Sequence, residues 1–156
     1  MPRQRTTLES AGAEFLVLGQ LLIEGIPAYK TYTNLLGYDL AATWPETNRS
    51  ARIQVKSRWA TDARHILVKN LDFDFLVLVG LNRGYLKNAA KSALPPEDPE
   101  SYVLTKEEAE GLLVDRDTAW PKIPWNEEQL KPHRRRWGIV RDFLEIPEEP
   151  KNPKAK

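Results

Sequence analysis

Apolar and polar positions follow a helical period over the first part of the chain. Between residues 8 and 25 the apolar side chains recur at helical spacing, and the segment ends at Gly25-Ile26-Pro27, as helices often do. Leu18, Leu21 and Leu22 fall within one arc of this predicted helix. Glu14 falls inside the same arc. Because burying a carboxylate alone is costly, we expect Glu14 to have a partner.

A period of two replaces the helical period over residues 51–57. Side chains alternate between the two faces of a strand, so Ile53 and Val55 share one face while Gln54 and Lys56 share the other. Ser57 falls on the apolar face, which favours a structural role for its hydroxyl. Two earlier strands are predicted over residues 28–32 and 38–43.

The second half of the chain opens with its most apolar run, residues 73–81. The run lacks alternation after Asp74, which indicates a central strand covered on both faces. Residues 82–99 hold three prolines and predict a loop, and residues 101–104 predict an outer strand. Further predictions are a capping box at Thr105-Lys106-Glu107-Glu108 opening a short helix, a wrapping loop over 115–132, a last helix over 139–144 and a disordered tail over 147–156.

These elements predict an α/β fold in which helices flank a mixed central sheet. At 156 residues the chain is long enough for one ordinary core and short for two. We therefore expect a single domain over residues 1–146, with its core at about 8–105 and a C-terminal extension at 106–146. The apolar stretch 15–26 is interrupted by Gln20 and Glu24, which is too polar for a membrane span or an export signal. A cytoplasmic protein is expected.

Composition restricts the chemistry that the chain can support. There is no cysteine, and His65 and His133 are the only histidines, so a catalytic metal would be held by oxygen. Oxygen ligands favour a hard cation such as Mg²⁺ or Mn²⁺. The net charge of +1 does not decide whether nucleic acid is a partner.

Four side chains from three predicted elements form a candidate catalytic set. Glu14 comes from the helix, Asp39 from a strand on the side opposite its apolar neighbours, and Gln54 and Lys56 from the next strand. Carboxylates can hold a divalent ion that withdraws charge from a phosphate and acidifies a water. A lysine beside them can orient that water or stabilise the developing charge. The set has the groups that hydrolysis of a phosphodiester requires.

The order Glu14, Gly37-Tyr38-Asp39-Leu40, Ile53-Gln54-Val55-Lys56-Ser57 and then an apolar strand resembles the PD-(D/E)XK nuclease superfamily. The resemblance covers residues 8–81. It implies a restriction-endonuclease-like core and a Mg²⁺-dependent deoxyribonuclease, with Glu14, Asp39 and Gln54 as metal ligands and Lys56 as the catalytic lysine. Tyr38 stands where proline is common and Gln54 where an acid is usual; a Gln-x-Lys version occurs in some homing-endonuclease-like and Holliday-junction-resolvase-like members.

DNA is the partner that this resemblance implies, and several basic residues are candidates for phosphate contacts. They are Arg52, Arg58 and Lys69 near the proposed site, and the run Arg134, Arg135 and Arg136. Three consecutive arginines cannot share one helix face, so a solvated helix start is an alternative for the run. Cleavage of both strands is most easily achieved by two sites, which favours a homodimer.

Other interpretations remain open. Glu14 could form a structural ion pair, with Lys56 or Arg52 as its partner, in a fold that has lost catalysis. Asp74 could be a further ligand or, as we favour, an acid that marks where the chain enters the sheet. A catalytically inactive nucleic-acid-binding module is the alternative function, and a protein-binding scaffold is a third.

Overall fold

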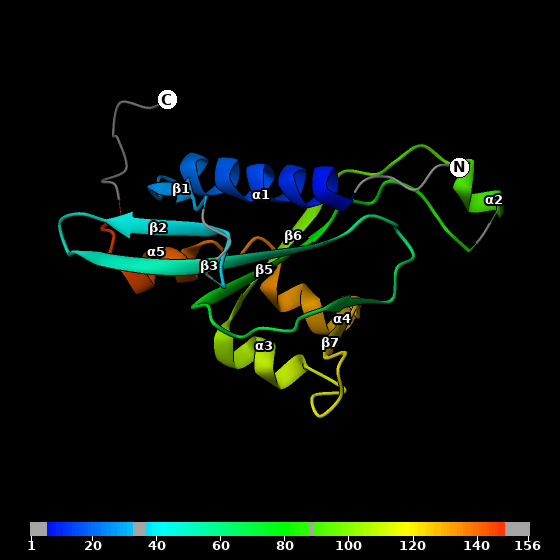
Figure 1. Cartoon of the computed structure of the whole chain (residues 1–156). Coiled ribbons are helices and arrows are strands. Elements are labelled where there is room, and N and C mark those ends of the chain that lie inside the picture. Colours follow the sequence, from blue (N-terminus) through cyan, green and yellow to red (C-terminus); the bar gives the residue numbers. More distant parts are fainter. Residues whose placement is uncertain (1–5, 33–36, 88, 149–156) are drawn as a thin grey trace.

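A mixed five-stranded sheet forms the centre of the computed structural model, which describes residues 6–32, 37–87 and 89–148 (Figure 1). Strands β3 and β5 are parallel, and the other neighbouring pairs are antiparallel. The order across the sheet is β1 (Ala28–Lys30), β2 (Leu40–Trp44), β3 (Arg49–Arg58), β5 (Phe75–Gly80) and β6 (Glu100–Thr105). The predicted α/β fold with a mixed central sheet flanked by helices is confirmed.

Helices cover both faces of this sheet. On one face α1 (Thr6–Ile23) and α5 (Gly138–Leu144) pack against the side chains that include Ile53 and Val55. The other face carries α3 (Lys106–Leu112), α4 (Glu127–Leu130) and the two-stranded sheet of β4 (His65–Leu67) and β7 (Lys122–Pro124). In Figure 1 α3, α4 and β7 lie on the side of the sheet away from α1. The remaining short elements are α2 (Ala89–Ser92) and the 3₁₀ turn η1 (Lys131–His133).

Strand β5 confirms the expected central strand, because all six of its residues are buried. The helix at the start of the chain is also confirmed, but its buried residues are Ala13, Val17 and Leu21. Leu22 is 52% exposed although it lies in the predicted arc, so the buried face is offset from that arc toward Ala13 and Val17. This helix carries apolar side chains around much of its circumference, so periodicity alone does not say which of them contact the sheet.

The capping box is confirmed: Thr105 accepts a hydrogen bond from the Glu108 backbone N–H, and the Glu108 side chain accepts one from Thr105. The wrapping loop over 115–132 was partly wrong, because it contains β7 and α4. Strand β7 forms because it pairs with β4, and Ile66 faces Ile123 across that pair. Most of the predicted tail, residues 149–156, lies outside the described residues. No helix in the described ranges is long and apolar enough to cross a membrane.

Candidate functional site

The site lies where β2 and β3 differ in length. Strand β2 begins at Leu40, which faces Ile53, whereas β3 continues to Arg58. The N–H of Val55 therefore lies beyond the paired part of β2 and donates to Oδ2 of Asp39 at 2.8 Å. Asp39 also donates its own backbone N–H to the carbonyl of Ile53 at 3.0 Å. These two bonds fix the Asp39 carboxylate beside the part of β3 that extends past the start of β2.

Glu14 reaches the same place from α1 and forms an ion pair there. Its Oε2 lies 2.8 Å from Nζ of Lys30, and the two side chains are only 18% and 16% exposed. The hydrogen bond to Glu14 raises the pKa of Lys30, so the ammonium form is favoured. The structural interpretation of Glu14 therefore had the wrong partner, because neither Lys56 nor Arg52 makes this ion pair.

Arg52 is held elsewhere by two acids that precede β5. Its guanidinium lies 2.6 Å from Oδ1 of Asp72 and 3.3 Å from Oδ2 of Asp74. Oδ2 of Asp74 also accepts a hydrogen bond from the Arg52 backbone N–H at 2.8 Å. Asp74 thus ties the start of β5 to β3, in line with the structural role that we favoured for it.

The two carboxylates of the site influence each other. Burial raises the pKa of Asp39, and the neighbouring Glu14 carboxylate raises it further. The Val55 N–H and the charge of Lys56 act in the opposite direction. Glu14, Asp39 and Lys56 are therefore close enough to interact electrostatically, although they come from three separate segments of the chain.

All four members of the predicted catalytic set line one cavity of about 670 Å³. A wider cleft of about 980 Å³ includes the same four residues and continues along β3 to Trp59 and Arg83. Within the described part of the chain, no three His, Cys, Asp or Glu side chains gather into a metal-binding group. Two carboxylates and the Gln54 amide remain as neighbouring oxygen donors, a donor type that suits Mg²⁺ or Mn²⁺.

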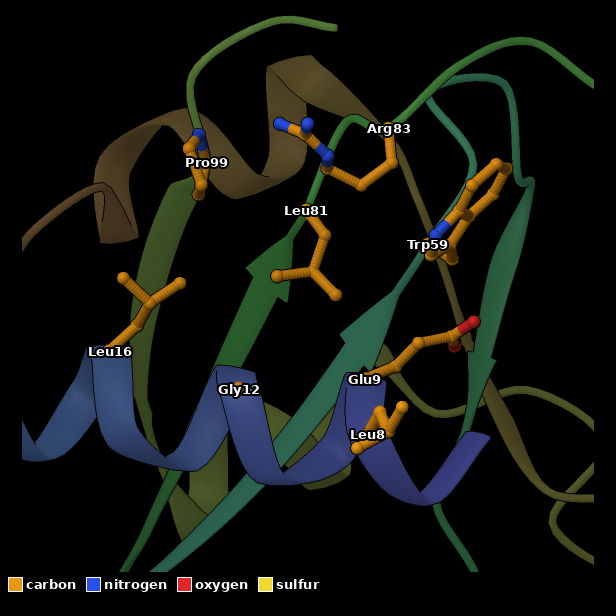
Figure 2. A pocket seen from close by; sticks show the side chains of 8 residues that line it. All are labelled: Leu8, Glu9, Gly12, Leu16, Trp59, Leu81, Arg83 and Pro99. Atoms are coloured by element: carbon orange, nitrogen blue, oxygen red, sulfur yellow. The ribbon is translucent and has the colours of Figure 1, made fainter. Parts of the chain in front are cut away.

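A second hollow of about 550 Å³ lies beside the first turns of α1. Figure 2 shows Leu8, Gly12 and Leu16 of α1 on one side, with Leu81 and Pro99 across from them. Its charged residues are Glu9 and Arg83. One carboxylate facing apolar side chains does not make a site for a divalent cation, so this hollow is not the catalytic candidate.

The basic residues predicted to contact DNA differ in how many contacts their charged groups already make within the protein. Arg58 is 8% exposed, lies 3.8 Å from the Trp125 ring centroid and donates hydrogen bonds to Ala63 and Asn82. Burial lowers the pKa of Arg58. This geometry favours a structural role for Arg58. Lys69 lines the 670 Å³ cavity, with Nζ 4.2 Å from the Trp120 ring centroid.

The arginine run contacts acids of the sheet and of α3. Arg134 and Arg135 both pair with Glu100, at 2.7 Å and 2.9 Å. Arg136 hydrogen-bonds the Glu108 carboxylate of the capping box. The run connects the C-terminal segment to β6 and α3, and its contact with phosphate stays a prediction.

Sequence reasoning missed Lys30. The residue ends a three-residue strand and faces Leu40 across the β1–β2 pair, which brings it next to Asp39 along β2. Nothing in the local sequence distinguishes it from a solvated lysine. Only the approach of α1 to β1 gives this lysine a place in the site.

The fold is similar to the solved structure of a bacterial homing endonuclease, I-Ssp6803I. The match has a TM-score of 0.55 and 18% sequence identity, and it covers 88% of this chain and 93% of that chain. No protein-family model matches the chain, and no curated protein matches it either. At this level of identity the likeness establishes the fold.

Proposed function

We propose that this protein is a DNA endonuclease of the PD-(D/E)XK type that depends on Mg²⁺ or Mn²⁺. One observation carries the proposal: Glu14, Asp39, Gln54 and Lys56, which come from three separate segments, line a single cavity beside the part of β3 that extends past β2. A homing endonuclease with a similar fold supports the choice of DNA as the substrate. The cytoplasmic location expected from the sequence fits such a substrate.

Each residue has a distinct task in this proposal. Glu14 and Asp39 would be charged metal ligands, and Gln54 a neutral ligand through its amide oxygen. When bound, the cation supplies Lewis acidity toward phosphate and water. Lys56 orients the attacking water and stabilises charge that develops on the phosphate. The Val55 N–H holds the Asp39 carboxylate in position before any ligand arrives.

A cleavage assay tests this assignment. Plasmid DNA and branched DNA are incubated with the protein and either Mg²⁺ or Mn²⁺, alongside the Lys56→Ala variant. Lys131→Ala is the matched control, because Lys131 is exposed in η1, outside the cleft. We expect wild type and the control to cleave and Lys56→Ala to lose cleavage. Cleavage that survives Lys56→Ala rejects the mechanism.

A catalytically inactive nucleic-acid-binding module is the second candidate. It is favoured by the glutamine at position 54 and by the Glu14–Lys30 ion pair, which neutralises one of the two acids. DNA binding without cleavage in either metal would select this function. Failure of DNA to bind at low ionic strength would favour the protein-binding scaffold instead.

We also propose that the nuclease acts as a homodimer, since two sites cut both strands of a duplex more readily than one. Sedimentation analysis of the protein with and without DNA tests this point. A mass of one chain under both conditions would restrict the enzyme to single-strand cleavage per binding event.

A further inference from the structure

Lys30 competes for an oxygen that the proposed metal site needs. Its ammonium group lies 2.8 Å from Oε2 of Glu14, and both side chains are largely shielded from solvent. The same ammonium lies 4.7 Å from the centroid of the Phe15 ring, which supports it from the side of α1. A cation is thus already bound to one of the two charged ligands.

Formal charges show what this contact does to the site. Glu14 and Asp39 contribute two negative charges, and Lys30 and Lys56 contribute two positive charges, so the four groups sum to zero. A divalent cation that enters meets no net attraction unless Lys30 moves away from Glu14. When Lys30 moves, its ammonium needs a new anion.

We propose that Lys30 has two positions in the reaction cycle: it neutralises Glu14 in the metal-free protein, and it contacts a DNA phosphate once a metal ion takes Glu14. This inference rests on the proposed nuclease function. Lys30, Lys56 and Lys69 all line the 670 Å³ cavity, so a phosphate that enters it meets several ammonium groups. Lys30 would then lower metal affinity without DNA and raise DNA affinity with metal.

A purely structural role makes a different prediction. If Lys30 only ties β1 to α1, its replacement lowers thermal stability and leaves the salt dependence of DNA binding unchanged, because no phosphate contact is lost. Measurements of binding therefore separate the two roles more sharply than measurements of activity or stability.

The test uses Lys30→Met, which removes the charge, and Lys30→Gln, which also keeps a hydrogen-bond donor for Glu14. Lys122→Met is the matched control, since Lys122 pairs with Asp115 at 2.9 Å outside the cleft. Calorimetry with Mn²⁺ and no DNA should show both Lys30 variants binding about tenfold more tightly than wild type, because one neighbouring positive charge is gone. The Lys122 variant should match wild type.

The second measurement is DNA affinity as a function of salt, with Ca²⁺ as a probe cation. Loss of one phosphate contact should reduce the slope of log affinity against log salt by about 0.9 in the Lys30 variants. Unchanged Mn²⁺ affinity, or an unchanged slope, in a folded Lys30 variant overturns the inference. Failure of the nuclease proposal looks different, because wild type would then bind no Mn²⁺ even with DNA, or Lys56→Ala would cleave normally.

Discussion

We expect the site to bind a divalent cation weakly in the absence of DNA, and replacing Gln54 by glutamate tests whether the neutral amide is a cause of this weakness. Gln54 is half-buried in β3 and lines the cavity with Glu14 and Asp39. The substitution keeps the length of the side chain and adds one negative charge beside the proposed ligands. The formal charges of Glu14, Asp39, Lys30 and Lys56 sum to zero, so the substitution would give these four residues and position 54 together a net charge of −1.

The expected gain follows from the interaction of one carboxylate with a divalent ion. At about 4 Å this interaction is worth roughly 2 kcal/mol in a water-like medium and roughly 8 kcal/mol at an effective dielectric of about 20. Because the cleft is open to solvent and the new carboxylate loses hydration, we expect the lower of these two interaction energies. About 2 kcal/mol corresponds to roughly thirtyfold in the dissociation constant.

Calorimetric titration of the DNA-free protein with Mg²⁺ and with Mn²⁺ measures this change. Gln20→Glu is the matched control, because Gln20 is exposed on α1 and the chemical change is the same. We expect tighter binding only in Gln54→Glu, and a lower melting temperature for it in EDTA, because a third carboxylate then repels Glu14 and Asp39. Equal metal affinity in wild type and Gln54→Glu would refute the role of Gln54 as a ligand, and tight Mg²⁺ binding by DNA-free wild type would refute the premise of a weak site.

Three further predictions concern Asp39, the capping box at Thr105 and Lys69. Burial raises the pKa of Asp39, so its carboxyl group favours the fold most below a pH of about 4, and this contribution is lost as the pH rises through the raised pKa. Asp39→Asn should therefore have a higher melting temperature than wild type at pH 7 in EDTA, because the neutral amide avoids the cost of burying a charge, and a lower melting temperature would contradict the burial argument. Thr105→Ala should lower the free energy of unfolding by about 1 kcal/mol in urea, because it removes the acceptor for the Glu108 N–H, whereas Thr105→Ser should retain it. Lys69→Ala should weaken DNA binding in a fluorescence anisotropy titration more than Arg135→Ala, because Arg135 is engaged by Glu100; the reverse order would assign the DNA surface to the arginine run.

The sequence predicted the main elements of the fold because their signals are local. A polar residue inside an apolar helical arc pointed to Glu14, and alternation along one strand placed Gln54 and Lys56 together. The capping box at Thr105 needed only a four-residue window. Each of these predictions depends only on the spacing of side chains along one helix or strand. That spacing does not depend on how the elements pack together.

Contacts between segments that lie far apart in the sequence could not be predicted in this way. Lys30 joins the site because α1 packs against β1, and Arg58 is buried because Trp125 arrives from a segment far along the chain. The pairing of β4 with β7 has the same origin. Burial and ion pairing depend on which segments meet, and the charge pattern alone made Arg58 resemble a surface arginine.

The unequal lengths of β2 and β3 explain why the catalytic candidates meet at this place. Had β2 continued along β3, a backbone carbonyl would accept the N–H of Val55, and a neighbouring strand would fill the cavity. Because β2 begins at Leu40, the preceding residue supplies its carboxylate to that N–H instead. This hydrogen bond gives the Val55 N–H an acceptor and holds the Asp39 carboxylate at the edge of the cleft. The shortened strand thus leaves the cavity open and positions the Asp39 carboxylate at its edge.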